Sequence, residues 1–513
     1  MASAIVGFVV CSQCGEREAD IFIRRNVADP ESLDPADRTV DLALCESCAR
    51  ARGLIVGKGR LDLRIGEILD SALTGDELGD QGGSPSARCP VCGIDLGAVL
   101  REGRLGCSGC VDAFRPALRR LLRRPPERLG GPAAHPETVG DSRRPEALPP
   151  SDRSRPFPFG FPAFDGGDGE GNGRPDSDVV LETVAILSRN LTGLPFVGNP
   201  RASAAPSRAI LGRLLGQLED FRSQAMGALP ASWRRTLAER AFVPRSYASD
   251  PEAPLAASLS EPVYVLSDDV DHLRIVARVG GFDPARALSI VARYADLVCR
   301  YLPVDRRFAA DEEFGWICAR LEDCGTGLST AAVLHLPALV MTGLHERFFK
   351  SALAEGAVVR GLYSLEGEAS AGSVYELSVG EARNGRSPEE LLVALVEAAV
   401  RAERRARESL AENNSEALRD AAGRAYGTAR YARKIEASEG LQLASRLRLA
   451  SLLGLLRGVE AKAFDPLLEG LGPGSLAREA GLDSLPDRGQ EDMLRARRLR
   501  SAISSATVEE GGD

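Results

Sequence analysis

The chain has 513 residues, of which 44% are hydrophobic, and its formal net charge at pH 7 is -9. This length predicts roughly two to four globular domains. The modest acidic charge excludes an overall electrostatic attraction of the molecule to nucleic acid or anionic lipid. The apolar start, MASAIVGFVV, has no positively charged region before it, and no later stretch approaches about 18 uninterrupted apolar residues. We therefore expect no signal peptide, no membrane span and a cytoplasmic location.

Eight of the eleven cysteines lie within residues 1–128, where they form four C-x-x-C pairs. Each pair can present two thiolates to a tetrahedral Zn²⁺, and in a reducing compartment such pairs favour metal over disulfides. At four thiolates per ion, the eight cysteines predict two structural zinc ions. Joining neighbouring pairs closes the shorter loops, which assigns the ligands of each ion. The alternative is a set of redox-active or unliganded thiols. The expected ligands are Cys11, Cys14, Cys45 and Cys48 at one site and Cys89, Cys92, Cys107 and Cys110 at the other.

A basic helix is expected directly after the second cysteine site. Its cluster of arginines fits either a phosphate-bearing or acidic partner, or simply a solvated face. No aromatic residues are interleaved with the charge, which speaks against nucleic acid. A zinc-ribbon nucleic-acid-binding regulator is therefore kept only as a further alternative. The arginines are Arg115, Arg119, Arg120, Arg123 and Arg124.

The remaining chain divides by composition and periodicity. Residues 129–175 are rich in Pro, Gly and Asp and are expected to be a disordered linker after the 1–128 zinc-ribbon module. Strand-like runs then alternate with helical ones, at 284–302 and 331–344, which predicts an α+β domain over 176–385. Ser387 followed by Pro388 and Glu390 predicts a capped helix start, and we expect a helical subdomain over 386–505 and a tail at 506–513.

Motifs in both halves of the chain resemble one known pair of proteins. LCESCA, RCPVCG and GRLGCSGCVDAF resemble the zinc-finger activator (McsA-type) of the bacterial protein arginine kinase. PDSDVVLETVAILSRNL at 175–191, DHLRI at 271–275, CGTGLSTAAVLHLPALV at 324–340 and VVRGLY at 358–363 resemble that kinase itself (McsB-type), a phosphagen kinase. The resemblance implies a fusion: small zinc-ribbon domains, then an α+β phosphagen-kinase-like domain with an antiparallel sheet flanked by helices, then a helical C-terminal subdomain.

The resemblance also implies how ATP would be held, and here the sequence departs from the family. Its first phosphate clamp reads Ser-Ser-Arg-x-Arg, where this chain has Glu182, Thr183, Val184 and, in place of the second arginine, Ile186. A further clamp arginine is replaced by Ser329. Of five expected phosphate-binding arginines only Arg274 and Arg360 remain, so the binding of ATP and Mg²⁺ is doubtful.

The reacting groups implied by the resemblance are replaced as well. The family's glutamate pair, which supplies the base, is here Asp269 and Val270, and its thiolate position is Arg320. Valine cannot accept a proton, and we expect Asp269 to point away from the site because neighbouring strand residues face opposite sides. A cation at 320 should repel a guanidinium substrate. Glu368 is a candidate residual acid, and Cys318 and Cys324 are read as structural.

The family also carries a phosphoarginine-binding site near its C-terminus. The matching residues that remain are Asp492 and Arg495, but the first arginine of the pattern is Glu491. A charged helix end explains the same residues equally well.

These departures favour a pseudokinase. The expected function is that of a non-catalytic regulator or adaptor in bacterial stress response and Clp-type protein quality control. By resemblance, its partners would be a Clp-type unfoldase, a heat-shock repressor or a separate active arginine kinase, and a homodimer is compatible with the pattern. The alternative is an active ATP:protein-arginine phosphotransferase with a rearranged site, using a base from Asp268, Asp269, Asp271 or Glu368 and a clamp from Arg189 or Arg320.

Overall fold

The computed structural model describes residues 21–26, 39–44, 55–56, 60–61, 87–122, 176–197, 199, 204–217, 220–303, 306–363, 370–380 and 386–508. The chain forms two compact units, the first made of Met1–Leu105 and Gly109–Arg124 and the second of Pro125–Asp513 together with Gly106–Ser108. Among the residues described, no helix is both long enough and apolar enough to cross a lipid bilayer.

The first unit contains two antiparallel hairpins and a helical, cysteine-rich segment. The hairpins are β1 (Ile21–Asn26) with β2 (Thr39–Leu44), and β3 (Ile55–Val56) with β4 (Arg60–Leu61). The helices are α3 (Leu96–Glu102) and α4 (Cys110–Leu121). Helix α3 begins where the Asp95 side chain accepts a hydrogen bond from the amide of Ala98 at 2.8 Å. Both helices turn apolar residues inward, and Val99 and Leu118 are fully buried.

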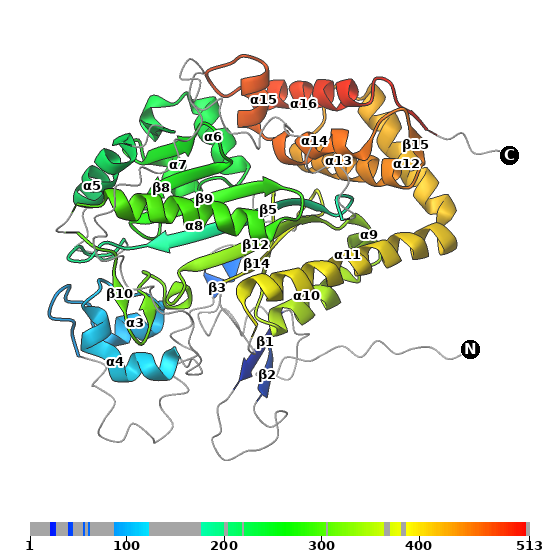
Figure 1. Ribbon diagram of the computed structural model, residues 1–513. Helices are drawn as coiled ribbons and strands as arrows, with labels where there is room; N and C mark the ends of the chain where they lie inside the picture. The colour runs from blue at the N-terminus through cyan, green and yellow to red at the C-terminus, as the bar shows by residue number, and fades with distance from the viewer. Residues whose placement is uncertain are drawn as a thin grey trace. The chain divides into compact units, whose positions relative to one another are not determined.

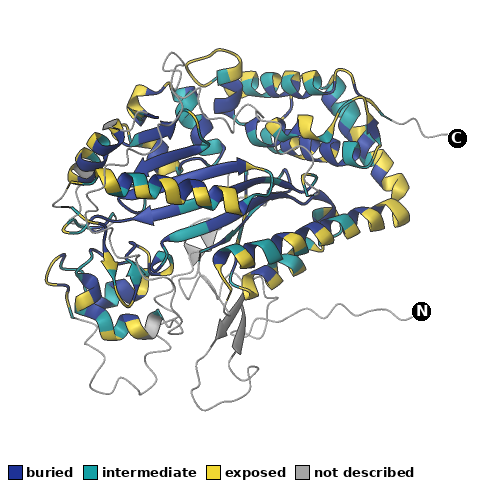
Figure 2. Ribbon diagram, viewed as in Figure 1, coloured by how far each residue is buried: buried dark blue, intermediate teal, exposed yellow. Residues whose placement is uncertain are grey.

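An antiparallel sheet of eight strands forms the centre of the second unit (Figure 1). Its strand order is β13-β14-β12-β5-β9-β8-β7-β6. The central strands carry near-continuous apolar runs because both faces of the sheet are covered (Figure 2). In chain order the strands are β5 (Val180–Arg189), β6 (Phe221–Ala225), β7 (Pro254–Ser258), β8 (Val263–Ser267), β9 (Leu273–Gly280), β12 (Leu328–His335), β13 (Val358–Gly361) and β14 (Val374–Val379).

Helices α5 (Ala204–Gln217) and α8 (Pro284–Tyr301) cover one face of the sheet. Helix α8 starts with Pro at its first position and with the Asp283 side chain accepting from the amide of Arg286. Figure 1 shows it lying over β5 and β9. The opposite face belongs to an apolar core that is continuous with the C-terminal helices. That second face carries the positions of interest for function.

The C-terminal subdomain is helical. The predicted capping box is present: the Ser387 hydroxyl accepts from the amide of Glu390 at 3.1 Å, and the Glu390 carboxylate accepts from the amide of Ser387 at 2.8 Å. The helices are α11 (Pro388–Asn413), α12 (Ser415–Tyr431), α13 (Ala437–Leu452), α14 (Asp465–Gly470), α15 (Pro473–Glu479) and α16 (Arg488–Ala502). The expected fold class, with its antiparallel sheet and helical C-terminal region, is confirmed.

A buried polar network joins this subdomain to the sheet. The Nδ1 of His335, the last residue of β12, accepts from the Arg448 guanidinium at 3.0 Å, so its Nε2–H donates to Ser445 at 2.8 Å. Arg448 also donates to the Asp465 carboxylate and to the backbone carbonyl of Asp178. Because Arg448 is 1% exposed, its charge depends entirely on these partners.

Two local expectations are wrong. Residues 331–344 were expected to be helical, but β12 runs to His335 and a short helix, α9 (Pro337–Met341), follows. A short apolar run buried on both faces does not distinguish strand from helix, and Pro337 supplies the break. Asp269 and Val270 do not alternate along a strand either. They lie in the connection between β8 and β9, where Asp268 adopts φ +59°.

Candidate zinc centre and kinase-like site

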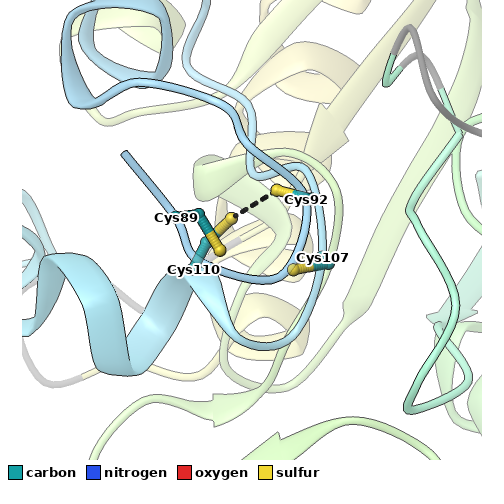
Figure 3. A group of neighbouring side chains, drawn as sticks. All are labelled: Cys89, Cys92, Cys107 and Cys110. Carbon is teal, nitrogen blue, oxygen red and sulfur yellow. Dashed lines mark hydrogen bonds between the residues drawn. The ribbon is translucent and has the colours of Figure 1, made fainter. Parts of the chain in front are cut away.

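Four cysteines of the segment 87–122 converge (Figure 3). Cys89 and Cys92 come from a knuckle closed by the hydrogen bond from the Gly93 amide to the Cys89 carbonyl, with Gly93 at φ +76°. Cys107 precedes α4, and Cys110 is its first residue. All four are buried, and their sulfur atoms lie within 4.8 Å of one another.

This donor set fits Zn²⁺. A tetrahedral ion with Zn–S bonds of about 2.3 Å separates its sulfurs by about 3.8 Å, and the Cys92 and Cys110 sulfurs are 3.5 Å apart. Four buried thiolates leave no position open for water or substrate, so a metal held here would stabilise the fold rather than react. The other expected ligand set, Cys11, Cys14, Cys45 and Cys48, lies outside the described residues.

The basic helix after the second cysteine pair is present as α4. Arg115 is ion-paired with Asp112 at 2.8 Å, and Arg119 is exposed. The side chain of Arg120, and the whole of Arg123 and Arg124, lie outside the described residues. The nucleic-acid alternative therefore stays a prediction.

In the second unit, the replaced clamp positions lie side by side on one face of the sheet. Ile186 of β5 pairs with Ser329 of β12, and Val184 pairs with Ala331. Alternate residues of a strand share a face, so Val184, Ile186 and Ser329 converge there. Val184 is 4% exposed and belongs to the apolar core beneath the C-terminal helices. Apolar and hydroxyl side chains thus stand where the family resemblance implies guanidinium groups.

Arg274 and Arg360, the two arginines that the resemblance implies as remaining phosphate clamps, are ion-paired within the domain. The Arg274 guanidinium contacts the Asp269 carboxylate, and although burial opposes its charge, Asp269 outweighs burial and raises the pKa of Arg274. Arg360 lies directly across from Glu376 on β14 and donates to both of its carboxylate oxygens at 2.9 Å. Neither guanidinium is left with an uncompensated positive charge for a phosphate.

The loop that carries the thiolate position is acidic. Arg320 is half exposed and lies 3.7 Å from Glu322. Burial, followed by the charges of Asp271 and Glu322, raises the pKa of Asp323 to about 6. Glu368, the candidate residual acid, lies outside the described residues.

Cys318 and Cys324 flank position 320 but are packed inside. They are 0% and 2% exposed, and the Cys324 sulfur lies 3.4 Å from the Cys318 amide nitrogen. Burial, with Asp271 next in size, raises the pKa of the Cys318 thiol well above its usual range. A nucleophilic or guanidinium-pairing thiolate needs the opposite environment.

The other groups named for a rearranged site are engaged in the framework. Arg189 is 8% exposed, stacks over Trp316 at 4.2 Å and donates to the backbone carbonyls of Ser188 and Thr326. Asp271 accepts from Asn190 and from the amide of Ala319. Asp268 accepts from the Ser207 hydroxyl at 2.7 Å, and burial raises its pKa to about 6.

The C-terminal pair lies on α16 with its arginine turned inward. Arg495 is 1% exposed and donates to the carbonyls of Leu471 and Ile435 and to the Asp492 carboxylate at 2.8 Å. Glu491 lies 3.9 Å from the same guanidinium. This arrangement ties α16 to the neighbouring loops.

One structural feature was not predicted from the sequence: Arg278 of β9 forms a buried ion pair with both carboxylate oxygens of Glu182. Its signal was present, because Arg278 lies within the apolar run IVARV and a buried arginine requires an acid nearby. Glu182 stands where the family resemblance implies a serine. The pairing of β5 with β9 connects the two residues.

Comparison with known proteins agrees with this architecture. Three family models match in succession: the McsA central zinc-finger domain at residues 87–135, the ATP:guanido phosphotransferase C-terminal catalytic domain at 207–404, and the protein-arginine kinase McsB C-terminal domain at 415–511. The fold and the cysteine site therefore define a guanido-phosphotransferase-type protein with a zinc finger ahead of it.

Relatives place the chain more narrowly. It is 32% identical to a protein-arginine kinase of Moorella thermoacetica over 346 residues, covering 65% of this chain and 96% of that protein. It is 30% identical to one of Symbiobacterium thermophilum, covering 66% of this chain and 96% of that protein. The chain belongs to the protein-arginine kinase family, and the predicted combination with an McsA-type zinc finger is confirmed.

Solved structures of phosphagen kinases are more distant. A duplicated taurocyamine kinase of Schistosoma mansoni with bound transition-state-analogue components gives a TM-score of 0.44 at 15% identity, covering 75% of this chain and 58% of that one. Lombricine kinase gives a TM-score of 0.38 at 16% identity, covering 47% and 70%.

Proposed function

We propose that this chain is a non-catalytic member of the protein-arginine kinase family, acting as a regulator or adaptor in bacterial stress response and protein quality control. One observation carries the proposal: the arginines that remain at phosphate-clamp positions, Arg274 and Arg360, are already neutralised by Asp269 and Glu376. A triphosphate would have to displace these carboxylates or accept them as like-charged neighbours. Either choice opposes binding.

The reaction itself is opposed in the same region. Phosphoryl transfer to arginine needs positioned positive charge for the phosphates and negative charge for the guanidinium. Arg320 reverses the sign at the thiolate position, and Val270 cannot accept a proton. Two like charges at 4 Å repel by about 4 kcal/mol at an effective dielectric constant of 20. Because Arg320 is half exposed and lies 3.7 Å from Glu322, only part of that repulsion would oppose a guanidinium substrate.

The proposed organisation follows from the sequence. Residues 1–128 form the zinc module, with two structural ions, 129–175 the linker, 176–385 the kinase-like domain and 386–505 the helical subdomain. We propose protein partners, namely a Clp-type unfoldase, a heat-shock repressor or an active arginine kinase, and a cytoplasmic location. Such a protein would bind through surfaces rather than through chemistry.

Catalytic activity is tested on the full, zinc-loaded chain. Radiolabelled ATP and an arginine-rich protein are supplied, and acid-labile phosphoarginine is measured against an Arg274→Ala, Arg360→Ala double variant. We expect both proteins to stay at background. Phosphoarginine formed by the unchanged chain alone would establish the alternative, a rearranged active kinase.

The regulatory role needs its own measurement. An active protein-arginine kinase is assayed on one substrate protein with and without an excess of this chain. We expect the rate to change at least several-fold, and the change to be lost with a Cys89→Ser, Cys92→Ser variant. An unchanged rate, together with no complex in sedimentation, would remove the active kinase from the proposed partners.

A further inference from the structure

Three buried charged side chains, Glu182, Arg278 and Arg240, and the partly exposed Glu469 form a continuous path from the clamp face of the sheet to the C-terminal helices. Glu182 of β5 accepts from Arg278 of β9 through both carboxylate oxygens, at 2.8 and 2.5 Å. Arg278 donates onward to the backbone carbonyl of Arg240 at 3.3 Å. The Arg240 side chain in turn is ion-paired with Glu469 of α14.

The path begins at a clamp position. In the antiparallel register Arg278 lies directly across from Val184, and Glu182 is two residues further along the same strand face. An arginine at 184 would therefore face Arg278 as a like charge. The Glu182–Arg278 pair and the loss of the clamp arginine are thus compatible with each other, whereas Arg278 and a clamp arginine are not.

The middle of the path is a tight turn after α6 (Ala231–Glu239). Arg278 also donates to the Ala241 carbonyl at 3.1 Å, and its guanidinium stacks on the Phe242 ring at 4.1 Å. Ala241 has φ +56°, which an alanine adopts only when its surroundings hold it there. The ion pair on the sheet therefore fixes the conformation of this turn.

The far end holds two C-terminal helices. Arg240 binds Glu469 of α14, and the preceding residue, Glu239, accepts from the amides of Gly474 at 3.1 Å and Ser475 at 3.4 Å in α15. A carboxylate at this helix start replaces hydrogen bonds that the helix cannot make internally. One turn thus connects the sheet with both helices.

We propose that Glu182, Arg278, Arg240 and Glu469 form a coupling strut, which makes the positions of α14 and α15 depend on the clamp face of the sheet. A protein bound at the C-terminal helices would then alter the kinase-like face, and a ligand at that face would alter the helices. The strut goes beyond the proposed function, since it would couple these regions whether or not phosphate is transferred. Its four members act as positioning residues.

Hydrogen exchange of the full chain, without nucleotide, tests the strut. Glu182→Gln breaks it at the sheet, Glu469→Gln breaks it at α14, and amide exchange is followed in residues 180–189 and 465–479. We expect each single variant to accelerate exchange in both segments by about tenfold, because buried charges lose their partners. The double variant should exchange no faster than the faster single one.

Two matched controls separate coupling from general destabilisation. Glu261→Gln removes a surface ion pair with the half-exposed Arg293. Tyr363→Phe removes a hydroxyl that lies near the strut but makes no hydrogen bond within the described part of the chain. Both should leave exchange unchanged. Single variants that disturb only their own segment, or effects that add in the double variant, would overturn the strut. If Glu182→Gln does not fold, Glu469→Gln alone decides, since it leaves the Glu182–Arg278 pair intact.

Discussion

The zinc centre and the clamp face of the kinase-like sheet show opposite relations between framework and functional groups. At the zinc centre the turn, the helix start and the four cysteines are all present, and buried sulfurs converge within 4.8 Å. On the clamp face the strands and their register are present, yet apolar residues and internal ion pairs occupy the converging positions. The zinc centre thus retains its metal-binding thiols, whereas on the clamp face the positive charge of Arg274 is paired with a carboxylate of the same domain.

The two regions are stabilised in different ways. A structural zinc site contributes its binding energy to folding, so removing one donor removes the fold of the module. A nucleotide site contributes nothing to folding until its ligand binds, and its clustered arginines repel one another. Replacing such a cluster by paired charges keeps the sheet stable without a ligand.

The largest expected effect lies at the zinc centre. Cys107→Ser should remove one zinc ion per chain and unfold residues 87–122, because binding to structural zinc sites is worth about 10–16 kcal/mol. Zinc content and amide exchange of that segment measure both outcomes. Cys299→Ser, outside the module, is the control. Full zinc content in the Cys107 variant would show that the four sulfurs do not share an ion.

The framework of the kinase-like unit gives the next largest effect. Arg448→Met should lower the free energy of unfolding by about 3–5 kcal/mol, since Asp465 and the Asp178 carbonyl lose a buried partner. Urea denaturation measures the loss. Arg424→Met, which removes an exposed pair with Asp420, should cost less than about 1 kcal/mol. Equal losses of unfolding free energy in the two variants would show that the buried network contributes no more to stability than an exposed ion pair.

An arginine placed at position 184 tests how the clamp face tolerates positive charge. Val184→Arg should destabilise the fold by about 3 kcal/mol, because it buries a charge opposite Arg278. Adding Arg278→Gln should recover part of that loss, since Glu182 can then pair with the new arginine. Val184→Leu controls for volume. If the losses of stability from the two substitutions simply add in the double variant, Arg278 does not interact with position 184.

The smallest effect is a pH dependence. Burial, and then the charges of Arg448 and Arg407, hold the pKa of His335 well below its usual range. The unfolded chain therefore binds a proton near pH 6.5 that the folded chain refuses, and stability should fall as the pH drops below that value. One proton contributes at most about 1.4 kcal/mol per pH unit.

Denaturation of the wild type and of His335→Gln at pH 5.5 and 7 isolates this contribution. Asp268 and Asp323, whose raised pKa values are about 6, act in the opposite direction but are common to both proteins. The wild type should lose more stability on acidification than the variant. Identical losses of stability in the two proteins would show that His335 does not cause the pH dependence.

Local patterns predicted much of this architecture. The C-x-x-C spacing predicted the cluster of Cys89, Cys92, Cys107 and Cys110, and Ser387-Pro388 predicted the start of α11, because both signals depend on nearby residues. The prediction of a helix over residues 331–344 was wrong, because burial on both faces removes the periodicity that identifies a strand. The Glu182–Arg278 pair was not predicted, since it depends on strands 96 residues apart in sequence.

Nucleotide binding distinguishes a non-catalytic chain from an active kinase. Isothermal titration of the full, zinc-loaded chain with MgATP measures whether the clamp face accepts a triphosphate, with an Arg274→Ala, Arg360→Ala variant as the reference. The internal ion pairs predict no saturable binding up to millimolar ATP in either protein. Saturable binding by the unchanged chain, weakened at least tenfold in the variant, would contradict the proposed loss of nucleotide binding and favour an active kinase.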